Sequence, residues 1–209
     1  MSGLLFVVSA ASGTGKTSLV KALLERVSNL HVSVSHTTRP QRPGELDGVH
    51  YHFTGKEDFI AQVAQGNFIE YAEVFGNYYG TAFATVRDQL AKGHDVLLEI
   101  DWQGAEQVRK LFPESRQIFI LPPSQFDLRQ RLSNRGTDSV EVIEHRLSCA
   151  VEDMRQYSNF DYIILNDDFN KALHDLESVI NANRLTQGQQ AKRHQELIQK
   201  LITPQSPDA

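Results

Sequence analysis

The sequence predicts an α/β protein with a parallel β-sheet at its core. Four short apolar runs rich in Val, Ile and Phe each precede a stretch of helical character, and the pairs are residues 4–9 and 18–27, 96–100 and 104–111, 117–121 and 125–132, and 162–165 and 169–184. This alternation is typical of strands buried on both faces and joined by crossover helices. With 209 residues, 40 % of them hydrophobic, the chain is long enough to bury such a core in one domain.

A region of different character separates the first of these units from the second. Between residues 31 and 80, strand-like patches alternate with turn-forming sequences; the patches are residues 32–34, 51–53 and 68–75, and the turns are residues 42–45 and 75–77. Open α/β sheets bind ligands at the carboxyl ends of their strands. We therefore expect a small, partly β subregion inserted at that end of the sheet.

Two further segments lie outside the alternating pattern. Residues 129–155 are helical in character and rich in arginine. The tail is polar and helix-prone from residue 187 to residue 201, and residues 203–209 are expected to fray.

Composition excludes several classes of protein. The net charge of −5 argues against a surface devoted to nucleic acid or anionic membrane, so any phosphate site must be local. Cys149 is the only cysteine, which rules out an internal disulfide and fits a reducing compartment. The apolar runs are too short to cross a bilayer, and the N-terminus does not resemble a secretory signal. We expect a soluble cytoplasmic protein that binds neither nucleic acid nor membrane.

The stretch SAASGTGKT, residues 9–17, lies between the first apolar run and the first helical stretch. It matches the phosphate-loop pattern G-x-x-x-x-G-K-S/T, whose backbone N–H groups surround phosphate oxygens at the positive end of a helix, except that Ala10 replaces the first glycine. The pattern predicts that Lys16 reaches the transferring phosphates and that the Thr17 hydroxyl binds Mg²⁺. The residues expected at the ATP phosphates are Ala11, Ser12, Gly13, Thr14, Gly15, Lys16, Thr17 and Ser18.

Three stretches indicate what accepts the phosphate: SHTTRPQRPGELDGVHY at residues 35–51, FIEYAEVFGNYYGT at 68–81 and EIDWQG at 99–104. Together with the phosphate loop they resemble the guanylate kinases in order and spacing, from about residue 4 to about residue 168. The resemblance implies transfer of the γ-phosphate of ATP to GMP, a reaction of purine nucleotide metabolism and GMP recycling. Many bacterial guanylate kinases also carry alanine at the position of Ala10.

The resemblance also implies one domain over residues 1–209, a P-loop nucleoside monophosphate kinase core with an inserted GMP-binding region and a helical lid. The core would comprise about residues 1–34, 82–124 and 156–209. The GMP-binding region would comprise about residues 35–81 and the lid about residues 125–155.

Two carboxylates are expected to read the guanine base. Guanine presents N–H donors at N1 and N2, whereas adenine presents a lone pair at N1, so a carboxylate there accepts from guanine and repels adenine. Polar sites of this kind discriminate by roughly 10⁴- to 10⁵-fold. The resemblance assigns this role to Glu70 and Asp101, with Ser35 and Thr81 as hydroxyl partners.

The phosphate of GMP is a dianion that needs fixed donors. Arg39 and Arg42 flank a proline-containing turn, and planar guanidinium groups suit bidentate phosphate binding. The resemblance assigns them to the GMP phosphate, together with Tyr51 and Tyr79.

Glu99 and Asp101 follow a buried strand and share a face at its carboxyl end. This is the place of a metal-organising acid in P-loop proteins. Guanylate kinases usually have aspartate at the position of Glu99, which leaves open whether Glu99 organises Mg²⁺ through water.

The arginine-rich segment is expected to close over the phosphates. Arg131, Arg135 and Arg146 match lid arginines of the guanylate kinases, and closure would stabilise developing charge while excluding water. Asn166 resembles an adenine-side contact. The predicted catalytic residues are therefore Lys16, Arg39, Arg131, Arg135 and Arg146.

The expected reaction is direct in-line attack by GMP on ATP·Mg²⁺, because a phosphate oxygen is already nucleophilic and positioning carries the catalysis. Two alternatives remain: a non-catalytic binding module, against which the intact GTGKT and lid arginines argue, and a kinase for another nucleoside monophosphate, against which the Glu70/Asp101 pair argues. The sequence leaves open the use of dGMP, the formation of a homo-oligomer, the extent of lid closure and regulation.

Overall fold

The computed structural model describes residues 3–74, 76–133 and 140–203. Its centre is a parallel sheet in the order β2-β7-β1-β8-β9, as the alternation of apolar runs predicts. The strands are β1 (Leu5–Ala10), β2 (Leu30–Val32), β7 (Asp95–Glu99), β8 (Arg116–Leu121) and β9 (Tyr162–Leu165).

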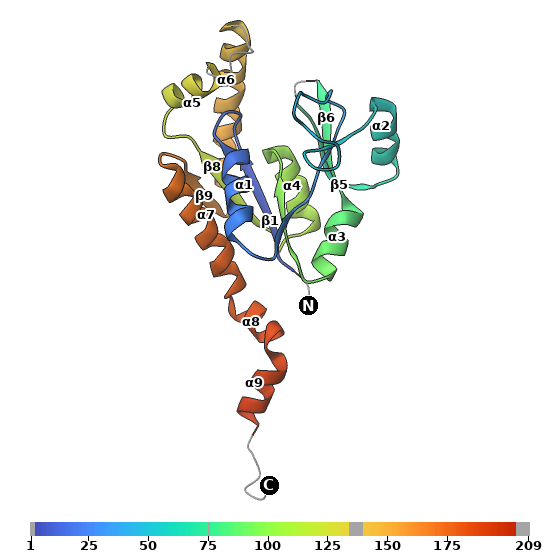
Figure 1. The fold of residues 1–209 in the computed structure, drawn as a ribbon, viewed down its shortest axis with the longest axis vertical. Coiled ribbons are helices and arrows are strands. Elements are labelled where there is room, and N and C mark those ends of the chain that lie inside the picture. Colours follow the sequence, from blue (N-terminus) through green and yellow to red (C-terminus); the bar gives the residue numbers. More distant parts are fainter. Residues whose placement is uncertain (1–2, 75, 134–139, 204–209) are drawn as a thin grey trace, which may run out of the picture.

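Helices cover both faces of this sheet (Figure 1). On one face, α1 (Lys16–Arg26) and α7 (Phe169–Arg184) bury leucines against Phe6 and Val8 of β1. On the other face, α3 (Phe83–Ala91) and α4 (Trp102–Leu111) pack against the alternate residues of β1. The strand is therefore buried on both sides, which explains why the apolar runs do not alternate with polar residues.

A second sheet, in the order β4-β3-β6-β5, is inserted between β2 and β7. It comprises β3 (His36–Thr37), β4 (His52–Phe53), β5 (Phe68–Val74) and β6 (Asn77–Ala82), and α2 (Lys56–Ala64) lies against it. Phe59 of α2 is fully buried and stacks on Phe68 of β5.

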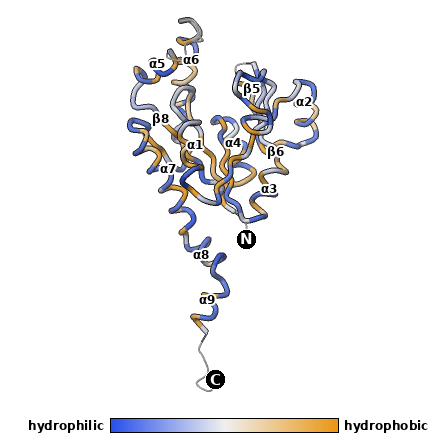
Figure 2. Tube along the Cα trace, viewed as in Figure 1, coloured by the Kyte–Doolittle hydropathy of each residue, from blue (hydrophilic) through white to orange (hydrophobic). Residues whose placement is uncertain are grey.

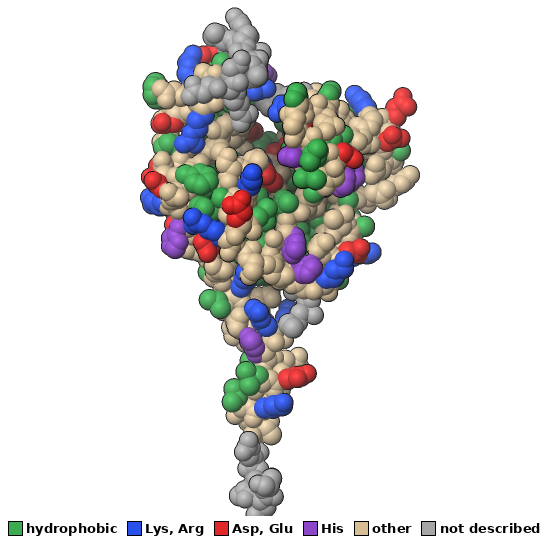
Figure 3. Space-filling view, in the orientation of Figure 1, with side chains coloured by type: hydrophobic (Ala, Val, Ile, Leu, Met, Phe, Trp, Pro, Cys, Tyr) green, Lys and Arg blue, Asp and Glu red, His purple; other side chains and the backbone are tan. Residues whose placement is uncertain are grey.

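The helices α5 (Gln125–Ser133) and α6 (Val140–Met154) lie at the carboxyl ends of the main strands, on the side opposite the second sheet (Figure 1). The 3₁₀ helix η1 (Arg155–Asn159) follows α6. The space-filling view is hollowed between this helical pair and the second sheet (Figure 3). The phosphate loop that precedes α1 lies between the two groups.

The C-terminal helices α8 (Gln187–Arg193) and α9 (Gln195–Ile202) extend away from the body (Figure 1). Hydrophobic positions recur along α9 (Figure 2), and its Leu197, Leu201 and Ile202 are exposed. Within residues 3–74, 76–133 and 140–203, no helix has the length and apolar character needed to span a membrane.

Several boundaries differ from the expected ones. The strand expected at residues 32–34 is β2, Leu30–Val32, and it pairs with β7 in the main sheet rather than with the inserted one. The helical tail breaks at His194. Part of the frayed segment, residues 204–209, and Phe75 of the expected turn lie outside the described residues.

Candidate active site

The phosphate loop joins the last residue of β1, Ala10, to the first of α1, Lys16. Gly13 and Gly15 have φ angles of 87° and 97°, a left-handed conformation that disfavours any residue with a Cβ. The loop is closed on itself, because the backbone N–H and the hydroxyl of Thr14 both donate to the carbonyl oxygen of Ala11, at 3.3 and 2.8 Å. The N-terminus of α1 is thus presented as an anion-binding end.

Ala10, the departure from the phosphate-loop pattern, is held in extended geometry. It pairs with Ile120 of β8 in the parallel ladder. Among the described residues, Asn29 is the only non-glycine residue with a left-handed φ, so the backbone at Ala10 does not require glycine. The replacement therefore leaves the turn at Gly13 and Gly15 intact.

Two residues at the start of α1 face the end of β7. The ammonium Nζ of Lys16 donates to the carbonyl oxygen of Ile100 at 3.0 Å. The hydroxyl of Thr17 donates to the carboxylate of Glu99. Hydroxyl and carboxylate oxygens are the ligands that Mg²⁺ prefers, so the donor set of Thr17 and Glu99 fits that ion.

A buried carboxyl group lies in the second sheet, facing α4. Glu70 of β5 is 3 % exposed and accepts from the Thr81 hydroxyl at 2.5 Å, and Thr81 lies 3.3 Å from the Ser35 hydroxyl. Asp101 caps α4 by accepting from the Gly104 backbone N–H at 2.8 Å. The structure therefore brings together all four residues predicted to read guanine.

Gly104 makes room for this arrangement. A Cβ at that position would lie 2.6 Å from Oε2 of Glu70. The pKa of Glu70 is raised to about 7, mainly by burial; the Asp101 charge acts in the same direction, while the Thr81 hydrogen bond and Lys16 oppose the shift. Glu70 is accordingly close to half-ionised at neutral pH.

Arg39, Tyr51 and Tyr79 also converge. The guanidinium carbon of Arg39 lies 5.5 Å from the centre of the Tyr51 ring, and the two tyrosine rings are 5.9 Å apart. Burial raises the pKa of Tyr51 to about 12, so its hydroxyl remains a donor at neutral pH. Arg42 is exposed at the edge of this cluster.

Glu45 is a member of this cluster that sequence reasoning missed. It accepts from the Arg39 guanidinium at 2.7 Å and from the Arg42 backbone N–H at 2.8 Å. The hydrogen bond to Glu45 raises the pKa of Arg39 and, in return, lowers that of Glu45. The sequence spacing of Glu45 could have predicted this contact, because a carboxylate three residues after Arg42 can fold back over the turn.

On the other side of the phosphate loop, α5 is anchored to it. The Arg131 guanidinium donates to the carbonyl oxygens of Thr14, at 2.9 Å, and Asn166, at 3.2 Å. The buried Asn166 amide donates to the same Thr14 oxygen at 2.7 Å. Asn166 thus lies directly against the loop, and its predicted contact with adenine stays a prediction.

Arg135 and Arg146 are the other two predicted lid arginines. Arg146 lies on α6, whereas Arg135 lies outside the described residues. Arg129, which does not match the lid pattern, forms an ion pair with Glu144 that links α5 to α6. Leu128 and Leu132 of α5 form a buried cluster with Ala11 of the loop.

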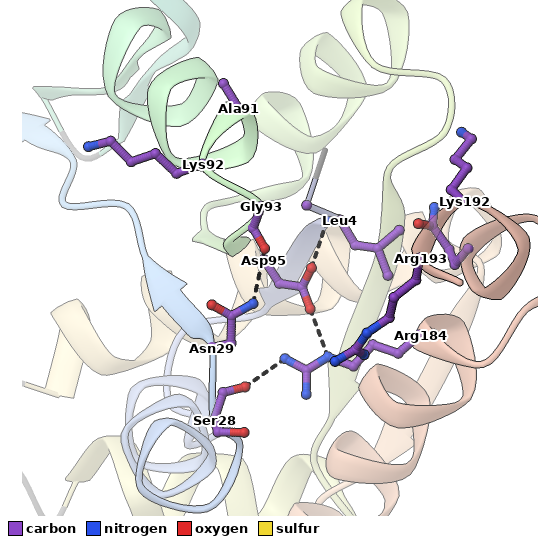
Figure 4. Close-up of a pocket in the computed structure, with 12 residues that line it drawn as sticks. Leu4, Ser28, Asn29, Ala91, Lys92, Gly93, Asp95, Arg184, Lys192 and Arg193 are labelled. Carbon is purple, nitrogen blue, oxygen red and sulfur yellow. Dashed lines mark hydrogen bonds and ion pairs between the residues drawn. The ribbon is translucent and has the colours of Figure 1, made fainter. Parts of the chain in front are cut away.

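A pocket of 490 Å³ lies elsewhere, beside the amino ends of β1 and β7 (Figure 4). There the Asp95 carboxylate accepts from the backbone N–H of Leu4 and from Arg184, each at 2.7 Å. In Figure 4, Lys92 and Lys192 point away from this pair. None of the described site residues lines the pocket. The ion pair between Arg184 and Asp95 joins the end of α7 to the start of β7.

The comparisons with known proteins all point to one enzyme family. The family model of guanylate kinase matches residues 2–183. Guanylate kinase of Acinetobacter baylyi is 84 % identical over 206 residues, which cover 99 % of this chain and 100 % of the relative, and that of Psychrobacter arcticus is 58 % identical, covering 97 % and 98 %. The crystal structure of guanylate kinase from Anaplasma phagocytophilum has a TM-score of 0.75 at 33 % identity, covering 89 % of this chain and 88 % of that one. This chain belongs to the guanylate kinase family.

Proposed function

We propose that the protein transfers the γ-phosphate of ATP to GMP, giving ADP and GDP. The observation that carries the proposal is the buried Glu70, aligned with Thr81 and Ser35 and adjoining Asp101, on the same edge of the molecule as the phosphate loop. A carboxyl group buried at 3 % exposure with few protein donors is costly to keep unless a ligand supplies them. The N1 and N2 groups of guanine are donors of that kind.

The acceptor phosphate has its own set of donors. Arg39, held by Glu45, offers a planar guanidinium group beside the hydroxyls of Tyr51 and Tyr79, and Arg42 adds a second cation at the rim. These groups hold and orient the GMP phosphate for attack. A general base is not required, because the attacking phosphate oxygen is ionised near neutral pH.

The donor phosphate meets cations from the core and the lid. Lys16 and the backbone N–H groups of the loop face the ATP phosphates, while Arg131 and Arg146 come from α5 and α6. Arg135 completes the predicted set. Cations placed around the transferring group stabilise its equatorial oxygens and offset the repulsion between the two substrates.

Thr17 and Glu99 would hold a magnesium ion at the loop. When bound, Mg²⁺ would supply positive charge that offsets the negative charge of the phosphates. The hydrogen bond between Thr17 and Glu99 keeps both oxygens on the same side of the loop. Glu99 has one methylene more than the aspartate usual in the family, and its contact with the ion through water stays a prediction.

The decisive experiment measures ADP formation from MgATP with GMP, dGMP, AMP, CMP and UMP in parallel. We expect turnover with GMP, none with AMP, CMP or UMP, and loss of activity in Lys16→Ala. GMP binding without turnover would favour a non-catalytic binding module, and turnover with AMP would favour a different monophosphate kinase. Accumulation of labelled protein from γ-labelled ATP would contradict direct transfer.

Three further expectations stay predictions: the acceptance of dGMP, a cytoplasmic location and the formation of a homo-oligomer.

A further inference from the structure

Trp102, the only tryptophan in the chain, connects the core to the lid. It is the first residue of α4 and follows Asp101 directly. Its indole Nε1 donates to Oδ1 of Asp153 at 3.0 Å. Because Asp153 lies near the C-terminal end of α6, this hydrogen bond joins the guanine-reading end of the core to a helix that carries Arg146.

The packing of α6 shows why this bond matters for orientation. Leu147 and Ala150 pack in the cluster that contains Ala11 of the phosphate loop, so one stripe of α6 is turned toward the loop. Arg146 and Asp153 are seven residues apart, close to two full turns, and therefore lie on the same flank of that stripe. The rotation of α6 that lets Asp153 accept from Trp102 is the one that presents Arg146 on the same side.

Asp153 also shares the electrostatic environment of the site. Burial raises its pKa, the Trp102 hydrogen bond lowers it, and the charges of Asp101 and Lys16 act on it in opposite directions. Its carboxylate is thus near both the guanine-reading acid and the phosphate-binding lysine.

We propose that Trp102 and Asp153 are positioning residues whose hydrogen bond fixes the rotation of α6 and thereby aims Arg146 at the transferring phosphate. The inference rests on the proposed function and deepens it. Neither side chain needs to touch a substrate, because the effect is exerted through Arg146.

Steady-state kinetics test the bond. We expect Trp102→Phe and Asp153→Ala each to lower kcat about tenfold, with KM for GMP and ATP changed by less than about twofold. Asp153→Asn keeps an acceptor oxygen for the indole and should stay within about threefold of the parent protein. Glu152→Gln, at an exposed neighbouring position paired with Arg155, is the matched control and should leave both parameters unchanged. If Asp153→Asn were as slow as Asp153→Ala, the charge rather than the hydrogen bond would matter, and the proposal would fail.

A double-mutant cycle tests the route through Arg146. In an Arg146→Ala background, Trp102→Phe should cause no further loss of kcat, because the group that it positions is gone. Multiplying losses would show that Trp102 acts independently of Arg146 and would overturn the proposal.

Fluorescence supplies a readout that does not need turnover. Since Trp102 is the only tryptophan, its emission reports directly on the indole. Asp153→Ala should change the emission and the acrylamide quenching of the free protein, whereas Glu152→Gln should not. Identical spectra for the parent protein and Asp153→Ala would refute the bond in solution. A parent protein that failed to phosphorylate GMP would instead refute the proposed function, with the fluorescence result still interpretable.

Discussion

The Glu70 carboxyl has a pKa raised to about 7, mainly by burial, so the proposed guanine binding should depend on pH. Only the ionised form accepts from N1 and N2, so affinity for GMP should fall as pH decreases through 7, approaching about tenfold per pH unit well below it. Calorimetric Kd values from pH 8 to pH 5.5 would measure this. The GMP phosphate titrates near pH ~6 as well. Glu70→Gln removes the carboxyl but not the phosphate, so the parent curve should be the steeper one; parallel curves would contradict the assignment.

Glu70 should also make the stability of the unliganded protein depend on pH. Stability should fall as pH rises, whereas the affinity for GMP should rise. The folded pKa of Glu70 lies above the model value of 4.5, so the folded state binds more protons between pH 4.5 and 7 and the free energy of unfolding falls as pH rises through that window. The shift corresponds to a loss on the order of 3 kcal/mol. Urea unfolding at pH 5 and pH 8 should show this slope in the parent protein and a smaller one in Glu70→Gln. Equal slopes would show that Glu70 is not buried in the free protein.

Ala10 offers a test of the phosphate loop. Because it is a strand residue with ordinary backbone geometry, Ala10→Gly should leave kcat/KM for ATP within about twofold and cost about 0.5–1 kcal/mol of stability. Gly15→Ala should behave differently, since Gly15 has a left-handed φ and a Cβ there would lie 2.8 Å from Nδ2 of Asn166. We expect Gly15→Ala to lose most of its activity. A gain in activity for Ala10→Gly would mean that the alanine impairs the loop.

Residues in local motifs could be predicted, whereas their long-range partners could not. Lys16 and Thr17 follow from nine consecutive letters of sequence, because the backbone of one loop determines their positions. Asn166 donates to Thr14, a residue 152 positions away, and Trp102 reaches Asp153 across 51 positions. Such contacts depend on how the strands are ordered in the sheet, and no local pattern encodes that order.

At the scale of elements, the close approach of α4 to β5 shapes the proposed guanine site. Gly104→Ala should displace the Glu70 carboxylate and raise KM for GMP by about tenfold or more, with KM for ATP nearly unchanged. Gly188→Ala in α8 is the matched control, because its Cβ would have nothing within 4 Å, and it should stabilise the helix slightly. If both variants left KM for GMP unchanged, the contact between α4 and β5 would not shape the site.

The helices show what periodicity can and cannot predict. The bounds of β9 and α7 agree with the expected residues 162–165 and 169–184, because a buried strand and a long amphipathic helix give strong patterns. By contrast, α1 begins two residues earlier than expected, at Lys16, because the left-handed Gly15 is its N-cap. Likewise α4 begins at Trp102, since Asp101 caps it.

Two helices were missed for a different reason. In α2 the buried residue is Phe59, and in α3 the buried residues are Val86 and Leu90, so neither has a wide apolar stripe. These short helices are fixed by the sheets that they cover rather than by their own sequence.

At the scale of the whole molecule, the proposed site is divided among three groups of elements. The second sheet and its loops carry most of the residues proposed to bind GMP, α5 and α6 carry Arg131 and Arg146, and the phosphate loop stands between them (Figure 1). Arg131 contacts the loop, whereas Arg39 is paired with Glu45 in the inserted region. We expect the two halves of the proposed site to approach each other before phosphoryl transfer.

Substrates should drive this approach, because the anionic phosphates attract cations from both sides and bring them together. Small-angle scattering of the full chain should show a smaller radius of gyration with GMP and a non-hydrolysable ATP analogue together than with either alone. The extension formed by α8 and α9 is common to all samples, so it cancels in the comparison. Lys16→Ala serves as the control with weakened ATP binding and should compact less with the analogue. Superimposable curves for the free and doubly liganded protein would mean that the site is assembled before the substrates arrive.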